Sequence, residues 1–355
     1  MQNNNPRLKS NNFDLLRFLF AGTVCLVHAC QLSGYKELGI ISTFLSSKIA
    51  VEAFFVVSGF LIFMSYERSS STRSYAEKRI RRIFPAYTVV VMLCALCLVF
   101  ISSKPSGEYF SSKWIKYVLA NLSFLNFIQH SLPGVFESNK LAAVNGALWT
   151  LKIEVMFYLS VPVFVYLFRR FSCLPILALV YFSSVIYVFI LSIFAGNSDS
   201  ELYVVLSRQL PGQLSYFMAG AFFYYFLHLF EKNSKYFVSF AILVLSINTT
   251  VSLSFIEPFA IATLVIFFGL FLYMGNFGKF GDISYGVYIL HFPIIQIFLH
   301  EEWFKESPWL FLISIIVVTS VGAMFMWHFV EKKFLHRGSH YVSATISRRS
   351  ITPNK

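Results

Sequence analysis

Apolar runs long enough to cross a lipid bilayer recur along the whole 355-residue chain. A membrane-spanning helix needs about 20 predominantly apolar residues, within a range of about 17–25. Hydrophobic residues make up 57% of the chain and charged residues only 13%, about half the charged share of a soluble protein. We therefore predict an all-α, polytopic membrane protein with about ten transmembrane helices. The predicted spans are residues 13–32, 46–66, 85–103, 147–168, 174–194, 209–230, 236–252, 257–274, 282–300 and 309–331.

Residues 114–130 form a shorter and more polar segment inside the long loop 103–146. We interpret this segment as interfacial or re-entrant, because counting it as a span would move the C-terminus to the other side of the membrane. Neither a repeat of helix pairs nor a second domain is apparent. We expect one integral-membrane domain over residues 1–335, followed by a short basic cytoplasmic tail over residues 336–355.

The distribution of basic residues sets the expected orientation. Most of the 29 lysine and arginine residues fall in segments that a cytoplasmic N-terminus places inside, as the positive-inside rule requires. Both termini are therefore predicted to be cytoplasmic. The net charge of +12 is spread over many short loops, which argues against a nucleic-acid partner. The first helix lacks a small-residue cleavage site, so we expect it to be retained.

The five cysteines lie in or at the edges of the predicted spans. Cys94 and Cys97 have the spacing of a redox or metal motif, but no second cysteine or histidine pair follows them. We interpret the cysteines as small apolar residues that pack between helices. Neither a structural disulfide nor a metal site is predicted.

Arg17 and His28 lie eleven residues apart in the first span. Eleven steps amount to about three helical turns, so both side chains leave one face, about 16 Å apart along the axis. Ionisable residues on a membrane-buried helix are costly and mark functional sites. Alternatively, Asp14 neutralises Arg17 from three residues away, and His28 bonds to a backbone carbonyl. Imidazole otherwise suits general-base work near neutral pH.

The densest basic cluster comes directly before the third predicted span, where Pro85 suits the first turn of the helix. Arg79 and Arg82 are three residues apart in this cluster. Guanidinium groups bind phosphates bidentately, which makes the pair a candidate phosphate site. The alternative is a cluster of charges that only sets topology.

Two carboxylates lie within predicted spans. Glu52 enters the second span near its outer end, and it either faces the site or lies at the surface. Glu154 shares a helix face with Tyr158, four residues later, in the fourth span. A carboxylate one to two turns inside a span indicates function, whereas pairing with Lys152 or Arg17 is the structural alternative.

Smaller polar groups mark the second and ninth spans. Ser58 precedes a glycine, and close helix packing is favoured over chemistry there. Ser284, Tyr288 and His291 fall on one stripe of the ninth span. His291 either lines a pore, orients a substrate, or caps the kink that Pro293 imposes.

Taken in order, these segments resemble acyltransferase family 3, the bacterial inner-membrane O-acyltransferases of cell-surface polysaccharides and lipids. Arg17 and His28 match the family's signature of an arginine, ten residues and a histidine. Glu52 stands where the family usually has aspartate, Lys152 replaces a usual serine, and Val155 replaces a frequent second acid. The further matching motifs are FFVxSGFLI, RxxRIxPxY, LWSLSVExxFY, ISYxxYLLHxP and VEKPF, at residues 54–62, 79–87, 148–158, 283–293 and 330–334.

The resemblance implies transfer of an acyl group, usually acetyl from cytoplasmic acetyl-CoA, to a sugar hydroxyl of a polysaccharide such as O-antigen or of its lipid-linked precursor. It makes His28 the essential histidine, Arg17 its partner, and Arg79 and Arg82 the family's RxxR pair. We expect Arg79 and Arg82 to hold the phosphates of the donor, and Arg17 to bind the donor or orient its thioester. We expect Glu154 to set the tautomer of His28 or to stabilise its charge. The remaining candidates, which support this site or contact the acceptor, are Glu52, Ser58, Tyr158, Tyr288 and His291.

The expected partners are an acyl-CoA co-substrate, a glycan acceptor and the lipid bilayer of the bacterial inner membrane, with no permanently bound cofactor. The alternative is a proton-coupled exporter of a glycan or small molecule, which ten helices with buried histidine, arginine and glutamate would also suit. The sequence shows no inverted repeat and no matched pair of broken helices, and both absences argue against the exporter.

Overall fold

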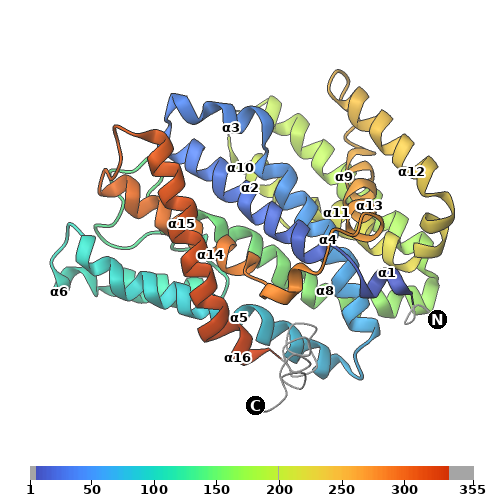
Figure 1. The fold of residues 1–355 in the computed structure, drawn as a ribbon, viewed down its shortest axis with the longest axis horizontal. Helices are drawn as coiled ribbons and strands as arrows, with labels where there is room; N and C mark the ends of the chain where they lie inside the picture. Colours follow the sequence, from blue (N-terminus) through green and yellow to red (C-terminus); the bar gives the residue numbers. More distant parts are fainter. Residues whose placement is uncertain (1–4, 199, 336–355) are drawn as a thin grey trace, which may run out of the picture. The chain divides into compact units, whose positions relative to one another are not determined.

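The computed structural model describes residues 5–198 and 200–335 (Figure 1). Within these residues all regular secondary structure is helical, and the predicted all-α, polytopic membrane class is confirmed. The chain forms two compact units. The first unit comprises residues 1–13, 51–76 and 153–276, and the second comprises residues 14–50, 77–152 and 277–355. The predicted tail, residues 336–355, lies outside the described residues.

Each of the ten predicted spans coincides with a helix. These helices are α2 (Phe13–Ser33), α4 (Ser47–Glu67), α5 (Thr72–Cys97), α8 (Trp149–Phe171), α9 (Cys173–Gly196), α11 (Leu210–Tyr225), α12 (Leu227–Asn248), α13 (Glu257–Phe271), α14 (Ser284–His300) and α15 (Pro308–Met326). The short elements are α1 (Pro6–Lys9), η1 (Lys36–Leu38), α3 (Gly39–Phe44), η2 (Leu98–Ile101), α6 (Ser106–Tyr109), α7 (Ser112–Leu122), η3 (Gly146–Leu148), α10 (Leu202–Ser207), η4 (Phe277–Phe280), the π-helical turn η5 (Trp327–Glu331) and α16 (Lys332–Phe334).

Six helical stretches of the described chain are long and apolar enough to cross a bilayer by length and composition. They are Phe13–Ser33, Lys36–Glu67, Thr72–Ile101, Gly146–Phe171, Cys173–Gly196 and Pro308–Phe334. The exact count of ten spans stays a prediction.

The predicted start of the third helix at Pro85 is wrong. Helix α5 begins at Thr72, and Pro85 lies in its interior. The basic segment before Pro85 is therefore helical, not a loop. Lysine and arginine are good helix formers. The basic residues before Pro85 therefore continue the apolar helix on its N-terminal side. Hydropathy marks where a helix enters the membrane and not where the helix begins.

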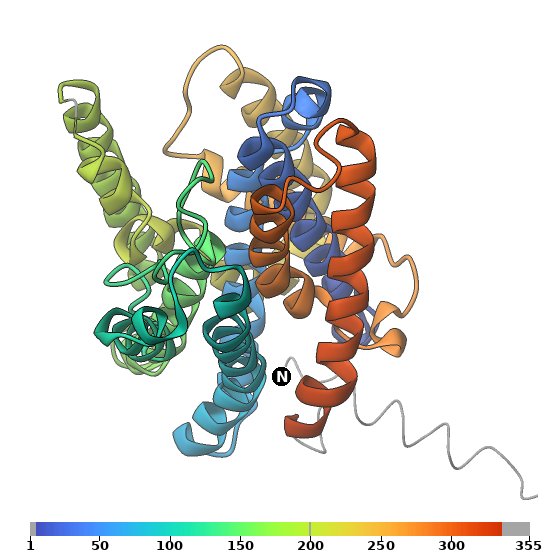
Figure 2. The ribbon, with the colours of Figure 1, turned by 90° about the vertical axis from the view of Figure 1, so that its left-hand side faces the viewer.

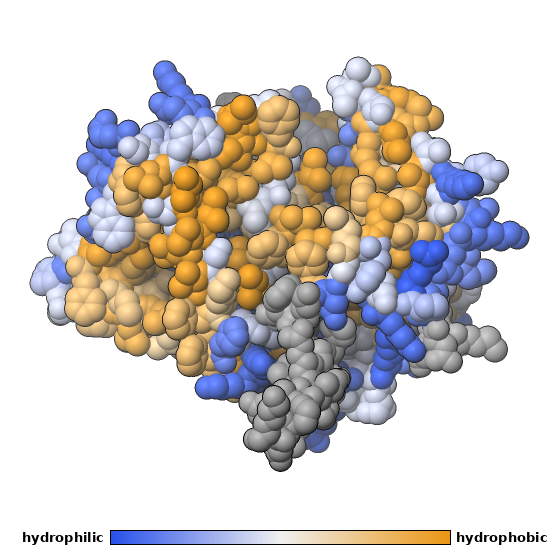
Figure 3. Space-filling view, in the orientation of Figure 1, coloured by the Kyte–Doolittle hydropathy of each residue, from blue (hydrophilic) through white to orange (hydrophobic). Residues whose placement is uncertain are grey.

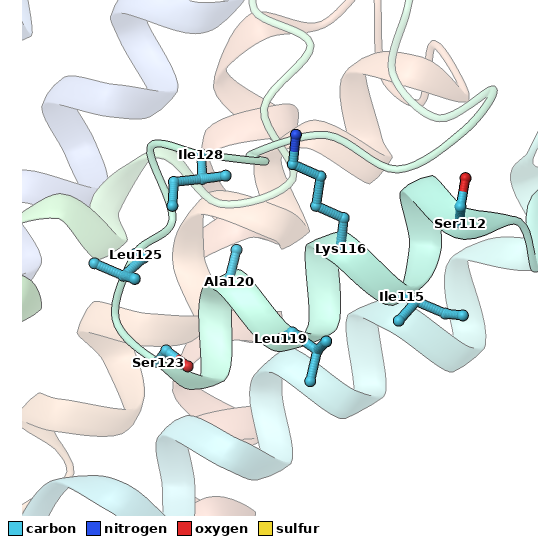
Figure 4. Close-up of a pocket in the computed structure, with 8 residues that line it drawn as sticks. All are labelled: Ser112, Ile115, Lys116, Leu119, Ala120, Ser123, Leu125 and Ile128. Carbon is cyan, nitrogen blue, oxygen red and sulfur yellow. The ribbon is translucent and has the colours of Figure 1, made fainter.

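The segment predicted to be interfacial or re-entrant contains α7, an eleven-residue helix. Such a helix is about 16 Å long, about half the thickness of a bilayer core. It packs on α5, since Trp114 Nε1 donates to the Ala95 carbonyl at 2.7 Å and Tyr87 donates to the Asn121 carbonyl at 2.8 Å. A pocket of about 420 Å³ lies on α7, lined mainly by apolar side chains and by none of the predicted site residues. Figure 4 shows eight of its lining residues.

In the first unit, glycines bring α4 and α11 into close contact. A Cβ atom on Gly59 would lie 2.0 Å from the Phe217 carbonyl oxygen, and one on Gly220 would lie 2.1 Å from the Val56 carbonyl oxygen. The Phe217 ring stacks on Phe157 of α8, with 4.0 Å between ring centroids. The glycine next to Ser58 therefore serves packing, as the sequence favoured.

In the second unit, α14 and α15 lie side by side in both ribbon views (Figures 1 and 2). A fully buried apolar cluster joins them to α2 through Ala29, Ile295, Phe311 and Ile315. Figure 3 shows apolar side chains along the visible surface of α15, and its exposed residues include Val317 and Phe325. An exposed apolar face of this extent fits contact with lipid.

We expect a side chain at Gly59 to destabilise the first unit. Gly59→Ala should lower the free energy of unfolding by about 1–3 kcal/mol, because α4 and α11 must separate to admit the methyl group. Gly22→Ala is the control, since no atom lies within 4 Å of a Cβ at Gly22. Thermal unfolding of both variants in one detergent tests this, and equal midpoints would contradict it.

Candidate functional site

Two histidines from helices far apart in the sequence meet in the second unit. His28 on α2 and His291 on α14 are joined by a contact of 2.9 Å between His28 Nδ1 and His291 Nε2. His291 is completely buried, whereas His28 is only half-buried. The edge of Phe292 packs against the His28 ring, with 5.6 Å between ring centroids. These two residues are called the histidine pair below.

The hydrogen bonds of the histidine pair determine which nitrogen carries each proton. The Val287 carbonyl lies 3.1 Å from His291 Nδ1, and a carbonyl oxygen only accepts, so His291 Nδ1 donates. When both rings are neutral, His291 Nε2 must then accept a hydrogen bond from His28 Nδ1–H. This places the lone pair of His28 on Nε2, where it can act as a base or as a nucleophile.

Arginines and carboxylates gather in a second group. Arg17 Nη1 donates to Asp282 Oδ2 at 2.6 Å, and Arg82 Nη2 donates to the same oxygen. Glu331 Oε2 lies 3.6 Å from Arg82 Nη1. Asp282 and Glu331 are each only 2% exposed. These four residues form the arginine–carboxylate cluster, in which two positive charges face two carboxylates, as buried charges require.

The two groups lie at different levels of the same pair of helices. Arg17 precedes His28 along α2, and Asp282 precedes His291 along α14. The contacts Arg17–Asp282 and His28–His291 therefore require α2 and α14 to run in the same direction. The levels are separated by about three turns, or about 16 Å, along α2.

Asn145 satisfies the backbone group that Pro293 frees inside α14. Proline has no N–H, so the carbonyl four residues before it loses its helical partner. That carbonyl belongs to Ile289, and Asn145 Nδ2 donates to it at 2.8 Å. The proline is thus accommodated without His291, which was one sequence-based alternative for that histidine. His291 contacts His28 instead.

Tyr288 is fixed beside the histidine pair. Its hydroxyl lies 2.6 Å from Thr150 Oγ1, which itself donates to the Ala147 carbonyl, so Tyr288 donates to Thr150. The Tyr288 ring stands edge-on to His291, with 5.9 Å between centroids. Tyr288 therefore packs against the pair with its hydroxyl already occupied.

The other predicted acidic and tyrosine residues belong to the first unit. Glu52 is buried and hydrogen-bonded to Tyr216 of α11. Glu154 accepts a hydrogen bond of 2.5 Å from Tyr158 one turn later. His28 Nδ1 contacts His291 Nε2, and the role of Glu154 towards His28 stays a prediction.

The two remaining predicted residues, Arg79 and Ser58, are half-buried on their helices. Arg79 is half-buried on α5, one turn before Arg82. Ser58 is half-buried on α4, in the first unit.

The sequence analysis missed Asp282, Glu331 and Asn145. Asp282 stands directly before the apolar part of the ninth span, where an acidic residue favours a helix N-terminus. Glu331 lies in the motif at residues 330–334, to which the sequence analysis assigned no site residue. For Asn145 a signal existed, because Pro293 requires some donor for the carbonyl it frees.

Comparison with known proteins identifies the family to which the chain belongs. The profile of a family described as an acyltransferase domain, family 3, matches residues 10–328. The chain is 28% identical over 343 residues to an O-acetyl transferase of Shigella phage Sf6, covering 94% of this chain and 99% of that protein. No solved structure matches the chain.

Two other relatives are more distant. Nodulation protein 10 of Rhizobium leguminosarum bv. viciae is 25% identical over 363 residues, covering 95% of this chain and 96% of that protein. A putative peptidoglycan O-acetyltransferase of Bacillus subtilis (strain 168) is 24% identical over 345 residues, covering 82% of this chain and 51% of that protein. Because the family profile extends over most of its length, the chain belongs to acyltransferase family 3.

Proposed function

We propose that this membrane acyltransferase is an O-acetyltransferase that moves acetyl from acetyl-CoA to a sugar hydroxyl. The acceptor is a surface polysaccharide such as O-antigen, or its lipid-linked precursor. Relatives named as O-acetyltransferases support the reaction class. A proton-coupled exporter has no counterpart among these names.

The observation that carries this proposal is the chain of contacts from His28 Nδ1 through His291 to the Val287 carbonyl. With both rings neutral, this chain leaves Nε2 of the half-buried His28 as the basic nitrogen. In one route, Nε2 takes the proton of the acceptor hydroxyl while the hydroxyl oxygen attacks the thioester carbonyl. The carbon–sulfur bond then breaks, and the thiolate recovers the proton from the imidazolium. In the other route, Nε2 attacks the thioester carbonyl, the carbon–sulfur bond breaks, and coenzyme A leaves as the thiolate. The acceptor hydroxyl then attacks the acetyl-imidazolium, the carbon–nitrogen bond breaks, and the hydroxyl proton passes to the thiolate.

The donor approaches from the arginine end in this proposal. Arg79 and Arg82 hold the phosphates of coenzyme A, and Arg17 orients the chain that leads to the thioester. Each arginine side chain carries five N–H donors. Arg17 and Arg82 can therefore bind Asp282 and a phosphate of coenzyme A at the same time. The flexible pantetheine arm of the donor covers the distance of about 16 Å to His28.

The shared direction of α2 and α14 supports the proposed topology. Two parallel spans need an odd number of crossings between them, and α4, α5, α8, α9, α11, α12 and α13 supply seven. Adding α7 as a span would make the two helices antiparallel. With a cytoplasmic N-terminus, the proposed topology has the arginine–carboxylate cluster at the cytoplasmic side of the inner membrane and His28 towards the opposite side.

Loss of the His28 imidazole should abolish transfer. His28→Ala is expected to lower acetyl transfer by purified protein in liposomes by at least about 100-fold, the usual range for a general base. His328→Ala is the control, because His328 lies exposed on the terminal π turn, where its Nδ1 contacts the Met324 carbonyl. Normal acetylation of the host glycan by folded His28→Ala protein would refute the assignment.

Turnover should depend on the hydrogen-bond acceptor that residue 291 offers to His28 more than on the imidazole ring of His291. His291→Gln can offer an amide oxygen to His28 Nδ1–H, whereas His291→Leu leaves that group without a partner. We expect the leucine variant to turn over about tenfold more slowly than the glutamine variant, the cost of one unsatisfied buried donor. Measured kcat values at matched levels of folded protein test this, and equal rates would be inconsistent with the tautomer argument.

The donor-binding role of Arg79 is tested by affinity. Arg79→Ala should weaken coenzyme A binding about tenfold or more, the value of a charge-assisted hydrogen bond. Arg81→Ala is the control, since Arg81 is exposed on the same helix and pairs with Glu77. Titration calorimetry of the purified proteins measures both, and equal affinities would exclude Arg79 from the donor site.

A further inference from the structure

Asp282 occupies the turn that leads into α14, and both of its carboxylate oxygens are engaged. Oδ1 accepts from the Ser284 backbone N–H at 3.1 Å and from the Ser284 hydroxyl. Oδ2 accepts from Arg17 and Arg82. One oxygen therefore anchors the carboxylate to the first turn of α14, while the other binds α2 and α5.

This arrangement fixes the position of α14 along α2. Asp282 stands nine residues before His291, and Arg17 stands eleven before His28. Further along the same helices, Ala29 and Ile295 pack in the buried apolar cluster. The histidine contact thus lies between an ion pair on one side and an apolar contact on the other. A slip of one helical turn would move His291 about 5.4 Å along the axis, well beyond hydrogen-bond reach of His28.

We infer that Asp282 is a positioning residue for the proposed acyl transfer, on which this inference rests. Asp282 acts through Arg17 and α14 to keep His291 Nε2 opposite His28 Nδ1, and it orients Arg17 and Arg82 for the donor. It contacts neither the histidine pair nor the reacting groups in this role. Removing its charge should therefore impair both donor binding and turnover in folded protein.

A residue that only neutralises charge would behave differently from a positioning residue. Neutralisation affects the amount and stability of folded protein, and its effect is independent of His291. Positioning affects kcat, and the effect depends on His291 being present. A double-mutant cycle separates the two, because residues that act through one another are not additive.

The experiment uses purified full-length protein in liposomes with acetyl-CoA. It compares wild type, Asp282→Asn, His291→Leu and the double variant. We expect Asp282→Asn to lower kcat at saturating donor by about tenfold, as the loss of the acceptor at residue 291 does, and to raise the donor KM. In the His291→Leu background the same change should lower kcat less than about threefold. Equal fold-losses in both backgrounds would overturn the inference.

Two further variants keep the outcome decisive. If Asp282→Asn yields no folded protein, Ser284→Ala replaces it in the cycle, because it loosens Oδ1 and leaves the charge. Unchanged kcat and KM in folded Ser284→Ala protein would then contradict the inference. Wild type and His28→Ala separate the hypotheses. A wild type that transfers no acetyl group refutes the proposed function, and turnover without His28 refutes the role of His28. An inactive His28→Ala beside a fully active Asp282→Asn refutes only the positioning role.

Discussion

The Asp282 carboxylate, which accepts hydrogen bonds from two arginines, is the interaction on which the second unit depends. A lone arginine in an apolar helix bundle is costly, and Arg17 pairs with Asp282 at the start of another helix. That pairing fixes α14 beside α2, and the histidine contact follows from the same placement. Electrostatic pairing and the geometry of the proposed chemistry are thus consequences of one contact. The two arginine–carboxylate bonds also hold in place the side chains of Arg17 and Arg82, which are predicted to bind coenzyme A.

Much of the helical architecture was predictable, because hydropathy alone decides which segments are stable in lipid. The ten apolar runs each coincide with a helix, and the shared face of Arg17 and His28 follows from helical periodicity. The start of α5 was not predictable in this way, since residues 72–84 lie in a polar helical extension.

Each proline inside a helix also predicts a side-chain donor from another element for the carbonyl that the proline frees, and the sequence analysis did not use this rule. Tyr75 donates to the Tyr158 carbonyl that Pro162 frees, as Asn145 does for Pro293.

The partners of the site residues could not be derived from the sequence. Asp282 lies 265 positions from Arg17, and His291 lies 263 positions from His28. No local spacing rule connects residues so far apart, and several carboxylates were equal candidates for pairing with Arg17. From the sequence we therefore predicted His291 as a supporting residue, and Glu154 as the residue that sets the tautomer of His28 or stabilises its charge. The structure supplies the missing information by bringing α2 and α14 together in one direction.

The account makes His28 Nε2 the reactive atom, with the donor held from the arginine end. Electron cryomicroscopy of the protein bound to a ketone analogue of acetyl-CoA tests this most directly. The account predicts the ketone carbon within about 6 Å of His28 Nε2, close enough for direct attack or for one intervening hydroxyl, and the phosphates beside Arg79 and Arg82. A ketone carbon beyond about 10 Å from Nε2, with no room for the acceptor hydroxyl to bridge them, would contradict it.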